Sequence, residues 1–406
     1  MERPARGPLD GLRVTELSTV LAGPYVGMVL ADLGADVVKV EPPDGDATRG
    51  YGPPWVGIGE QRVAAYYLAV NRNKRSLRLD LHTAAGREVL RRLVGRSDVL
   101  VENFRPGGLA RLGFDAKALA ELNPGLVHLA ITGYGPDGPD AAKPGYDFIA
   151  QAVGGLMSIT GFADEHAGGP TKVGVAISDL VTGLFGAVAV LAALRERDGQ
   201  GGAGQRIDVS LLEGTLAMLI NQAQNAFVSG VSPGRRGNAH PNIVPYETFA
   251  TADGEIAVAV GSERQWPRLC RALDLPELAD DPRFADNDTR VHNRDVLRPI
   301  IAERLASAGS AAWLARLEAA QVPCGAVNDV LAAFGQAQAQ ARVMSPTIEH
   351  PVLGRLRQVG IPFKLSRTPA SIRSAPPLLG EHSATVLAEI GYEGEEIQKL
   401  AAEDVI

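Results

Sequence analysis

The 406-residue chain is long enough for about two or three domains, and its 45% hydrophobic and 21% charged composition is that of a globular protein. A net charge of −7 gives no reason to expect nucleic acid or an anionic membrane surface as a partner. Cys270 and Cys324 lie outside any CxxC or Cys/His cluster, which argues against a metal site and points to the reducing cytoplasm. The N-terminus has no apolar signal-peptide core, so we expect no secretion signal there.

Short apolar segments alternate with helical ones through the first half of the chain. Strands are predicted at 13–17, 36–41, 76–81, 98–103 and 126–133, and helices at 23–33, 84–95 and 108–121. This alternation predicts an α/β fold with an open parallel sheet covered on both faces by helices.

The pattern of predicted elements changes after residue 230. Before that point we expect helices at 146–157, 179–196 and 212–229, with a strand starting at Arg206. After a linker at 231–240, an antiparallel hairpin turns at Ala252-Asp253-Gly254, and helices follow at 263–273, 289–307 and 310–320. The remaining elements are a helix near 329–341, strand-like pieces near 355–365 and a helical tail. A smaller second domain is therefore predicted at roughly 230–330.

The segment VGVAISDLVTGLFGAVAVLAAL (173–194) contains one ionisable residue, Asp179. The segment is long enough to span a membrane, but its carboxylate, threonine and glycines favour a buried helix. Asp179 is a good candidate for the helix N-cap. A carboxylate there could equally act as a covalent nucleophile beside amides that stabilise an oxyanion. The small neighbours that would leave room for a substrate are Gly174, Ala176, Ser178 and Gly183.

Other motifs are individually ambiguous. The turn after the first strand lacks GxGxxG, which argues against a nicotinamide dinucleotide. VENFRPG (101–107) and LDLH (79–82) each follow a strand, where a loop could stack an adenine and pair with phosphate, or simply end the strand. His240 and Tyr246 are more typical of structural side chains than of catalytic ones.

Taken in order, several segments resemble the family III CoA-transferases, the group that includes formyl-CoA transferase and carnitine CoA-transferase. These segments are LDGLRV, LAGP, DLGADVVKVE, NRNKRSLRLDL, VENFRPG, GYGPDGP, KPGYD, SDLVTG and GNAHPNIVPYETF. The resemblance implies a Rossmann-like large domain built from residues 1–200 and 335–406, a linker helix at 201–230 and an inserted α+β domain at 231–330. It also implies an interlocked homodimer whose active site lies between one subunit's large domain and the other's small domain.

The resemblance further implies that Asp179 is the nucleophile and that it forms an aspartyl-CoA thioester, with no metal and no nicotinamide. The matching CoA-binding residues are Leu21, Ala22, Leu79, Asp80, Leu81, His82, Asn103, Phe104, Arg105, Arg111, Lys143, Tyr146 and Asp147. Candidates for contact with the acid substrate are Arg49, Arg72, His240, Tyr246 and Gly261. Pro42 stands where formyl-CoA transferase has an arginine, so the CoA contacts there must differ.

Two alternatives remain open at this stage. Racemases of the same fold pair the aspartate with a histidine, but here the stretch reads Gly145-Tyr146-Asp147, and tyrosine is a poor base at neutral pH. A non-catalytic acyl-CoA binder would share the fold without turnover. The segments YYLAVNRNKRS and GNAHPNIVPYETF look most like the succinate–hydroxymethylglutarate branch, which predicts dicarboxylic acids such as succinate, glutarate or hydroxymethylglutarate as substrates.

Overall fold

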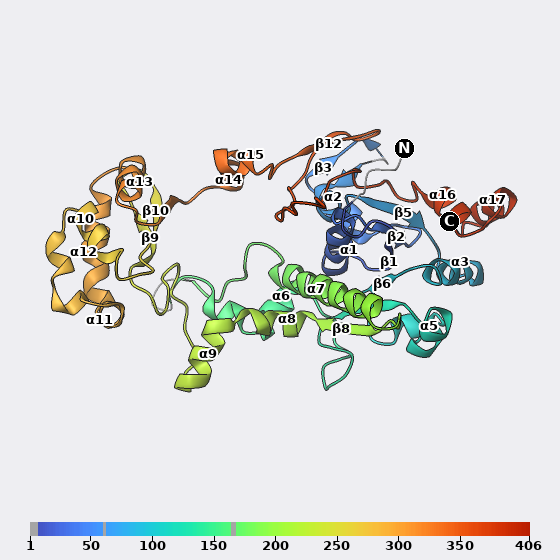
Figure 1. Ribbon diagram of the computed structural model, residues 1–406, viewed down its shortest axis with the longest axis horizontal. Coiled ribbons are helices and arrows are strands. Elements are labelled where there is room, and N and C mark those ends of the chain that lie inside the picture. Colours follow the sequence, from blue (N-terminus) through green and yellow to red (C-terminus); the bar gives the residue numbers. More distant parts are fainter. Residues whose placement is uncertain (1–6, 60–61, 164–167) are drawn as a thin grey trace. The chain divides into compact units, whose positions relative to one another are not determined.

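The chain forms two compact units in a computed structural model that describes residues 7–59, 62–163 and 168–406 (Figure 1). The first unit contains the chain up to Leu156 together with Lys172–Phe227 and Gln338–Ile406. The second contains Met157–Thr171 and Val228–Ala337.

A six-stranded sheet forms the centre of the first unit. Its strands are β1 (Arg13–Glu16), β2 (Asp36–Glu41), β5 (Lys74–Arg78), β6 (Val99–Glu102), β7 (Val127–Thr132) and β8 (Arg206–Ser210). They lie in the order β5-β2-β1-β6-β7-β8, and every neighbouring pair is parallel. The predicted parallel sheet is confirmed. The strand expected at 76–81 begins two residues earlier and ends at Arg78, the partner of Glu41 at the end of β2.

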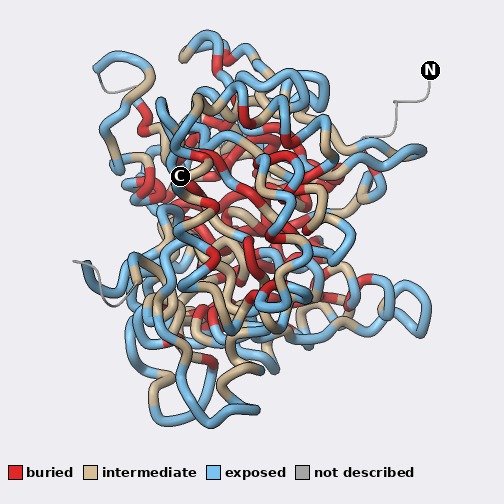
Figure 2. Tube along the Cα trace, turned by 90° about the vertical axis from the view of Figure 1, so that its left-hand side faces the viewer, coloured by how far each residue is buried: buried red, intermediate tan, exposed pale blue. Residues whose placement is uncertain are grey.

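Alternating residues of these strands face two apolar layers, as the period of two requires. Val37 packs with α1 (Ala22–Asp32) and α7 (Ile177–Gly199) in one core cluster. Val38 packs on the opposite face with α3 (Ala84–Val94), α16 (Ser383–Glu389) and α17 (Gly394–Ala402). Buried segments, drawn in red, lie mostly inside the exposed, pale-blue ones (Figure 2). Within the described ranges α7 alone is long and apolar enough to cross a membrane, yet Val190 and Leu194 belong to the sheet's core.

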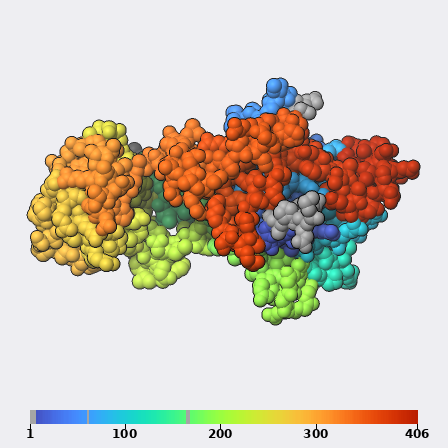
Figure 3. Space-filling view, turned by 45° about the horizontal axis from the view of Figure 1, so that its top comes forward, coloured from blue at the N-terminus to red at the C-terminus, as the bar shows by residue number. Residues whose placement is uncertain are grey.

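The C-terminal residues return to the N-terminal part of the same unit (Figure 3). Asn73 joins them through its backbone N–H, which donates to the Ser374 carbonyl at 3.0 Å, and through its side-chain oxygen, which accepts from the Arg373 N–H. The Ser383 hydroxyl accepts a hydrogen bond from the Arg78 N–H beside the edge strand. Residues 338–406 therefore complete this unit. The remaining elements here are η1 (Ala47–Gly50), β3 (Trp55–Val56), β4 (Val63–Ala64), α2 (Ala65–Val70), α6 (Asp147–Val153), α15 (Ala337–Ala341), β12 (Thr347–His350) and β13 (Gly354–Arg357).

Two of the helices predicted before residue 230 are each divided in two. The segment 108–121 forms α4 (Gly108–Arg111) and α5 (Ala116–Leu122), because Gly113 adopts a left-handed φ of 89° and Asp115 caps a new helix. The segment 212–229 forms α8 (Leu211–Met218) and α9 (Ile220–Ser229), with Ile220 at a φ of 32° between them.

The second unit contains the predicted hairpin. β9 (Tyr246–Ala250) and β10 (Glu255–Ala259) are antiparallel, and β11 (Cys324–Ala326) pairs on the other side of β10. Its helices are α10 (Trp266–Ala272), α11 (Asn287–His292), α12 (Arg294–Ala306), α13 (Ser310–Ala319) and α14 (Val330–Gly335), with 3₁₀ turns at Leu156–Ile159, Pro276–Ala279 and Pro282–Phe284. Trp266, Phe284 and Trp313 are buried in a core of their own. The helix predicted at 289–307 is interrupted at Asn293, which ends α11.

At Gly183, α7 lies close to α1. A methyl group added at Gly183 would lie 2.8 Å from the Ala22 carbonyl oxygen and 3.3 Å from Tyr25 Cδ1. The small size of Gly183 therefore allows the two helices to pack closely. The prediction that Gly183 leaves room for a substrate is wrong. Ser178 is also occupied, since its hydroxyl accepts a hydrogen bond from the Thr215 hydroxyl at 2.7 Å.

We expect Gly183→Ala to lower the free energy of unfolding by about 1–3 kcal/mol, because two backbones must move apart. Denaturant unfolding followed by circular dichroism measures this. Gly394→Ala is the matched control, because no atom lies within 4 Å of the added methyl group at the start of α17. Equal stability of the two variants would contradict the close packing of α1 and α7.

Candidate active site

The strand order places a switch point between β1 and β6. β2 and β5 extend the sheet on one side of β1, and β6, β7 and β8 extend it on the other. The loops that leave two adjacent strands at such a point diverge and open a crevice beyond their carboxyl ends, where α/β sheets bind ligands. A pocket lies there, lined by residues 19–22 after β1, 103–106 after β6 and 131–133 at the end of β7.

This pocket contains most of the site residues predicted in the first unit. Those that line it are Leu21, Ala22, Asn103, Phe104, Arg105, Lys143, Tyr146, Asp147 and Asp179. Further lining residues that sequence reasoning did not single out are Thr19, Val20, Pro106, Ile131, Thr132 and Leu211. Most of these follow a β-strand, so their place at the carboxyl edge was the available signal. Gly133, Pro144 and Gly145 also line the pocket, and they belong to the loops at 133–139 and 143–147 that were expected near the ligand.

Asp179 lies in the first turn of α7 but is not its N-cap. The helix begins at Ile177, and its N-cap Ala176 makes no side-chain cap. The capping bond comes from Asp147, whose Oδ1 accepts from the Ser178 N–H at 2.8 Å. The N-cap prediction for Asp179 is therefore wrong, because Asp147 on α6 supplies the acceptor and leaves the Asp179 carboxylate unused.

Asp147 is itself held in place by Gln151. The Gln151 side-chain amide donates to Asp147 Oδ2 at 2.8 Å, and its oxygen accepts from the Val173 N–H at 2.8 Å. These bonds tie the start of α6 to the segment that leads into α7. Asp147 was expected to contact CoA, and its observed hydrogen bonds fix the turn that carries Asp179.

The environment of Asp179 favours the protonated form. Burial, and then the negative charge of Asp147, raise the pKa of Asp179 to about 7. Among the described residues, no hydrogen bond or ion pair reaches its side chain. Tyr66 on α2 is nearby, since the charges of Asp179 and Asp147 add to burial in raising its pKa to about 12. An unpaired carboxylate with a raised pKa at a pocket wall is typical of a functional group.

The cationic side chains near the pocket differ in their availability. Arg105 lines the pocket and Arg111 ends α4, and within the described ranges neither has an ion pair. Lys143 lies 2.7 Å from Asp140 Oδ1 on an exposed loop. Arg49 and Arg72 do not line the pocket. Arg49 pairs with Glu41 at 2.7 Å and Arg72 with Asp32 at 2.7 Å, so both charges are already balanced.

The remaining predicted residues lie elsewhere. Leu79 is buried beyond the end of β5, and Asp80 turns the chain by accepting from the His82 N–H at 2.8 Å, so residues 79–82 border α3 and do not line the pocket. His240, Tyr246 and Gly261 belong to the second unit. There the rings of His240 and Tyr246 are 5.2 Å apart, and the Gly261 N–H donates to the Gln265 side chain.

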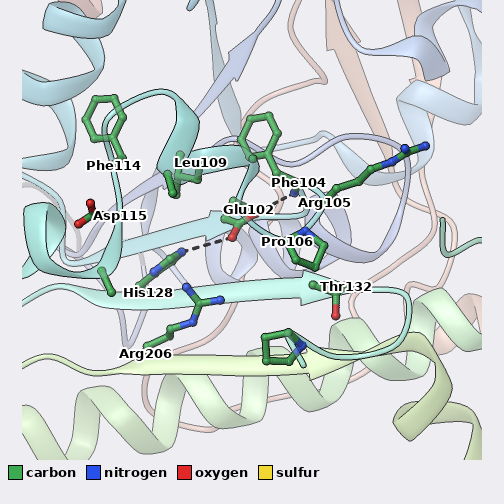
Figure 4. A pocket seen from close by; sticks show the side chains of 15 residues that line it. Glu102, Phe104, Arg105, Pro106, Leu109, Phe114, Asp115, His128, Thr132 and Arg206 are labelled. Carbon is green, nitrogen blue, oxygen red and sulfur yellow. Dashed lines mark hydrogen bonds and ion pairs between the residues drawn. The ribbon is translucent and has the colours of Figure 1, made fainter. Parts of the chain in front are cut away.

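A second hollow lies between the 103–108 loop and β8 (Figure 4). It shares four lining residues with the first, namely Phe104, Arg105, Pro106 and Thr132. At its base Glu102 Oε1 lies 3.5 Å from His128 Nε2, and the other oxygen accepts from the Phe104 N–H at 2.7 Å. The Glu102 carboxylate therefore fixes the start of the loop that lines the pocket beside Asp179. Within the described part of the chain, no group of three His, Cys, Asp or Glu side chains is arranged to hold a metal ion.

Known proteins resemble this chain over nearly its full length. The model of the family described as CoA-transferase family III matches residues 9–383. The chain is 45% identical to a succinate–glutarate CoA-transferase of Agrobacterium fabrum over 94% of its length and 96% of the relative. It is 39% identical to a human succinyl-CoA:glutarate CoA-transferase over 98% of its length and 90% of the relative. A crystal structure of a CaiB/BaiF family protein from Brucella suis, 44% identical, matches with a TM-score of 0.84 over 95% of this chain and 100% of that one.

Proposed function

The chain belongs to CoA-transferase family III and is a CoA-transferase, and on this premise we propose that it moves CoA between dicarboxylic acids through a covalent intermediate on Asp179. One observation carries the proposal. The Asp179 carboxylate lies at the wall of a switch-point pocket, among the described residues it has no hydrogen bond or ion pair, and its pKa is raised to about 7. A poorly solvated, unpaired carboxylate is a better nucleophile than one that accepts hydrogen bonds.

The first half of the proposed reaction transfers CoA to the enzyme. An Asp179 oxygen attacks the donor thioester carbonyl, the carbon–sulfur bond breaks, and the products are a mixed anhydride on Asp179 and the CoA thiolate. The thiolate then attacks the Asp179 carbonyl carbon of that anhydride. The donor leaves as a free carboxylate, and an aspartyl-CoA thioester remains.

The second half reverses these steps with a new acid. The acceptor carboxylate attacks the carbonyl carbon of the aspartyl thioester, the carbon–sulfur bond breaks, and a second mixed anhydride forms as the CoA thiolate leaves. The thiolate attacks the acceptor's carbonyl carbon, and Asp179 leaves as a carboxylate. Every intermediate stays activated, so water must be excluded from the site to prevent hydrolysis.

The start of α1 is suited to stabilise the oxyanions of these steps. Its N-cap Leu21 provides no side-chain cap, and its first turn contains no acidic residue. The first amide groups of a helix carry partial positive charge and have no partner within the helix. We therefore assign the amide of Ala22, which lines the pocket with Asp179, and that of the next residue, Gly23, to the developing negative charge.

The same pocket supplies groups for the CoA moiety. Phe104 presents an aromatic ring at the loop after β6, and Arg105 and Lys143 add positive charge to the lining. Stacking on the adenine and pairing with the phosphates would use this combination. Arg111 is placed one turn beyond this loop and is a further phosphate contact in the proposal.

The proposed assembly is a homodimer in the cytoplasm that uses no metal and no nicotinamide. Support for a partner subunit comes from exposed apolar side chains on the helices around the site. These include Phe148 and Val153 on α6, Leu184, Phe185 and Val188 on α7, and Leu216 on α8. Single exposed apolar side chains are common on protein surfaces, whereas a group of them on neighbouring helices is typical of a subunit interface.

Acyl exchange tests the proposed function directly. We expect the protein to convert succinyl-CoA and glutarate into glutaryl-CoA and succinate, with total thioester conserved, because CoA passes between acids without reaching water. Liquid chromatography with mass detection quantifies both CoA esters and free CoA. If succinyl-CoA is only hydrolysed, or is not consumed with succinate, glutarate or hydroxymethylglutarate as acceptor, dicarboxylate CoA transfer is contradicted.

A further inference from the structure

A cluster of fully buried charges lies beneath the pocket wall and is not used by the reaction steps above. Lys39 Nζ lies 3.0 Å from Glu16 Oε1 and 2.9 Å from Asp46 Oδ2, and all three side chains are 0% exposed. Lys74 Nζ lies 2.8 Å from the other oxygen of Glu16 and is also 0% exposed. Glu16 therefore bridges two buried lysines.

These side chains hold both ends of one segment of the pocket wall. Lys39 donates to the Ser18 carbonyl at 2.8 Å, and Lys74 donates to the Pro24 carbonyl at 2.7 Å in the first turn of α1. The residues between these two carbonyls include Thr19, Val20, Leu21 and Ala22, all of which line the pocket with Asp179.

The middle of the segment is fixed as well. The Asn103 side chain accepts from the Thr19 N–H at 3.0 Å and donates to the Thr19 carbonyl at 2.8 Å. Asp46 Oδ1 lies 3.4 Å from the Val20 N–H. Val20 has a φ of 69°, which a β-branched residue adopts only when its surroundings impose it.

Two glycines of α1 lie in close contact with this cluster or with the loop that it holds. A methyl group added at Gly27 would lie 1.9 Å from Glu16 Oε2, and one added at Gly23 would lie 2.2 Å from Ser18 Cβ. α1 therefore rests directly on the charged cluster and on the loop that the cluster holds.

Stability alone does not account for four buried charges. Removing ions from water is costly, and apolar side chains of similar volume often give an equally stable core. The contacts that apolar side chains could not make are the hydrogen bonds to Ser18, Val20 and Pro24. These contacts determine where the amides of α1 lie relative to Asp179.

We infer that Glu16, Lys39, Asp46 and Lys74 form a buried clamp that sets residues 18–24 against Asp179 and makes these four side chains positioning residues for the CoA transfer. The inference rests on the proposed function. It predicts that loosening the clamp slows formation of the aspartyl-CoA thioester, because a displacement of about 1 Å at a reacting centre costs on the order of 100-fold in rate.

Two charge-balanced double variants test the clamp. Lys39→Met/Asp46→Asn removes one charge of each sign and keeps the Glu16–Lys74 pair. Glu16→Gln/Lys74→Met keeps the Lys39–Asp46 pair. Neither leaves a buried charge without a partner. The control is Arg197→Met/Asp98→Asn, which removes a 3.0 Å, partly exposed pair between α7 and the residue before β6, at the amino end of that strand.

We expect both double variants to unfold cooperatively and to bind CoA within about threefold of the wild type, since Phe104, Arg105, Arg111 and Lys143, to which CoA binding is assigned above, lie outside residues 18–24. Adduct formation from succinyl-CoA, followed by rapid quench and intact mass, should be about 100-fold slower at saturating donor. Backbone hydrogen exchange in residues 17–25 should be faster in both variants and unchanged in the control.

Three results would overturn the clamp. They are wild-type adduct rates in both variants, weaker CoA binding with an unchanged rate at saturation, and failure of both variants to fold. If the wild type itself forms no adduct with any donor, the proposed function fails. Hydrogen exchange then still decides whether the cluster holds residues 17–25.

Discussion

Asp179→Ala and Asp179→Asn are expected to abolish the covalent CoA adduct and to lower acyl exchange by about 10⁴-fold or more. The reason is that both anhydrides and the thioester of the proposed route form on this carboxylate, and no second carboxylate is in its position. Asp147, the nearest candidate, already accepts hydrogen bonds from the Ser178 N–H and from Gln151. Rapid quench with succinyl-CoA, followed by intact mass and peptide mapping, measures the adduct and locates it.

The matched control for this experiment is Glu196→Gln, an exposed carboxylate near the far end of the same helix. It should form the adduct at the wild-type rate. CoA affinity of Asp179→Ala should stay close to that of the wild type, which separates loss of chemistry from loss of binding. A covalent adduct that persists in Asp179→Ala would place the nucleophile elsewhere and contradict the mechanism.

The local pattern of the sequence was sufficient to predict the parallel sheet. Asp36–Glu41 was predicted with both ends correct, because Val37, Val38 and Val40 form a short apolar run, interrupted only by Lys39, that is typical of a strand buried on both faces. The position of Asn103–Arg105 at the pocket followed from the end of a strand, since the carboxyl ends of parallel strands share one edge. The family resemblance added the expected role of Asp179, which neither pattern nor spacing could supply.

Long-range polar contacts explain most of what sequence reasoning missed. Arg49 and Arg72 looked like free cations for a substrate carboxylate, but Glu41 and Asp32 pair with them from distant positions. Asp179 looked like a cap because the true acceptor, Asp147, is 31 residues from its donor Ser178. No local signal identifies such partners, because they meet only when the sheet and its helices are assembled.

The residues of the buried clamp could be predicted only in part from the sequence. Glu16 and Lys39 stand within apolar runs that were predicted as buried strands, and a charge in such a position needs a partner. This signal was present in the sequence. What it could not give was the pairing of Lys39 with both Glu16 and Asp46, or the bond to the Ser18 carbonyl beside the active site.

The raised pKa of Asp179 predicts opposite effects of pH on rate and on stability. The nucleophile must be ionised, so the rate of adduct formation should fall tenfold per pH unit below about 7 and reach a plateau above it. The folded state binds the Asp179 proton more tightly than the unfolded state does. The resulting stability is fully present below the unfolded pKa of 3.8 and is lost as pH rises through about 7.

Asp179→Asn isolates this contribution, because asparagine imitates the neutral carboxyl group. At pH 8 we expect the variant to be more stable than the wild type by up to roughly 4 kcal/mol, and at pH 4 to be equal to it. Urea unfolding at the two pH values measures the difference.

Asp147→Asn should shift the pH at which the rate of adduct formation begins to fall to a lower value, since it removes the negative charge beside Asp179. A rate independent of pH between 5 and 8, with no gain in stability for Asp179→Asn at pH 8, would show that Asp179 is already ionised at low cost. Ionisation of Asp179 in the folded protein would then not lower the free energy of unfolding, as we expect it to do for a poorly solvated carboxylate.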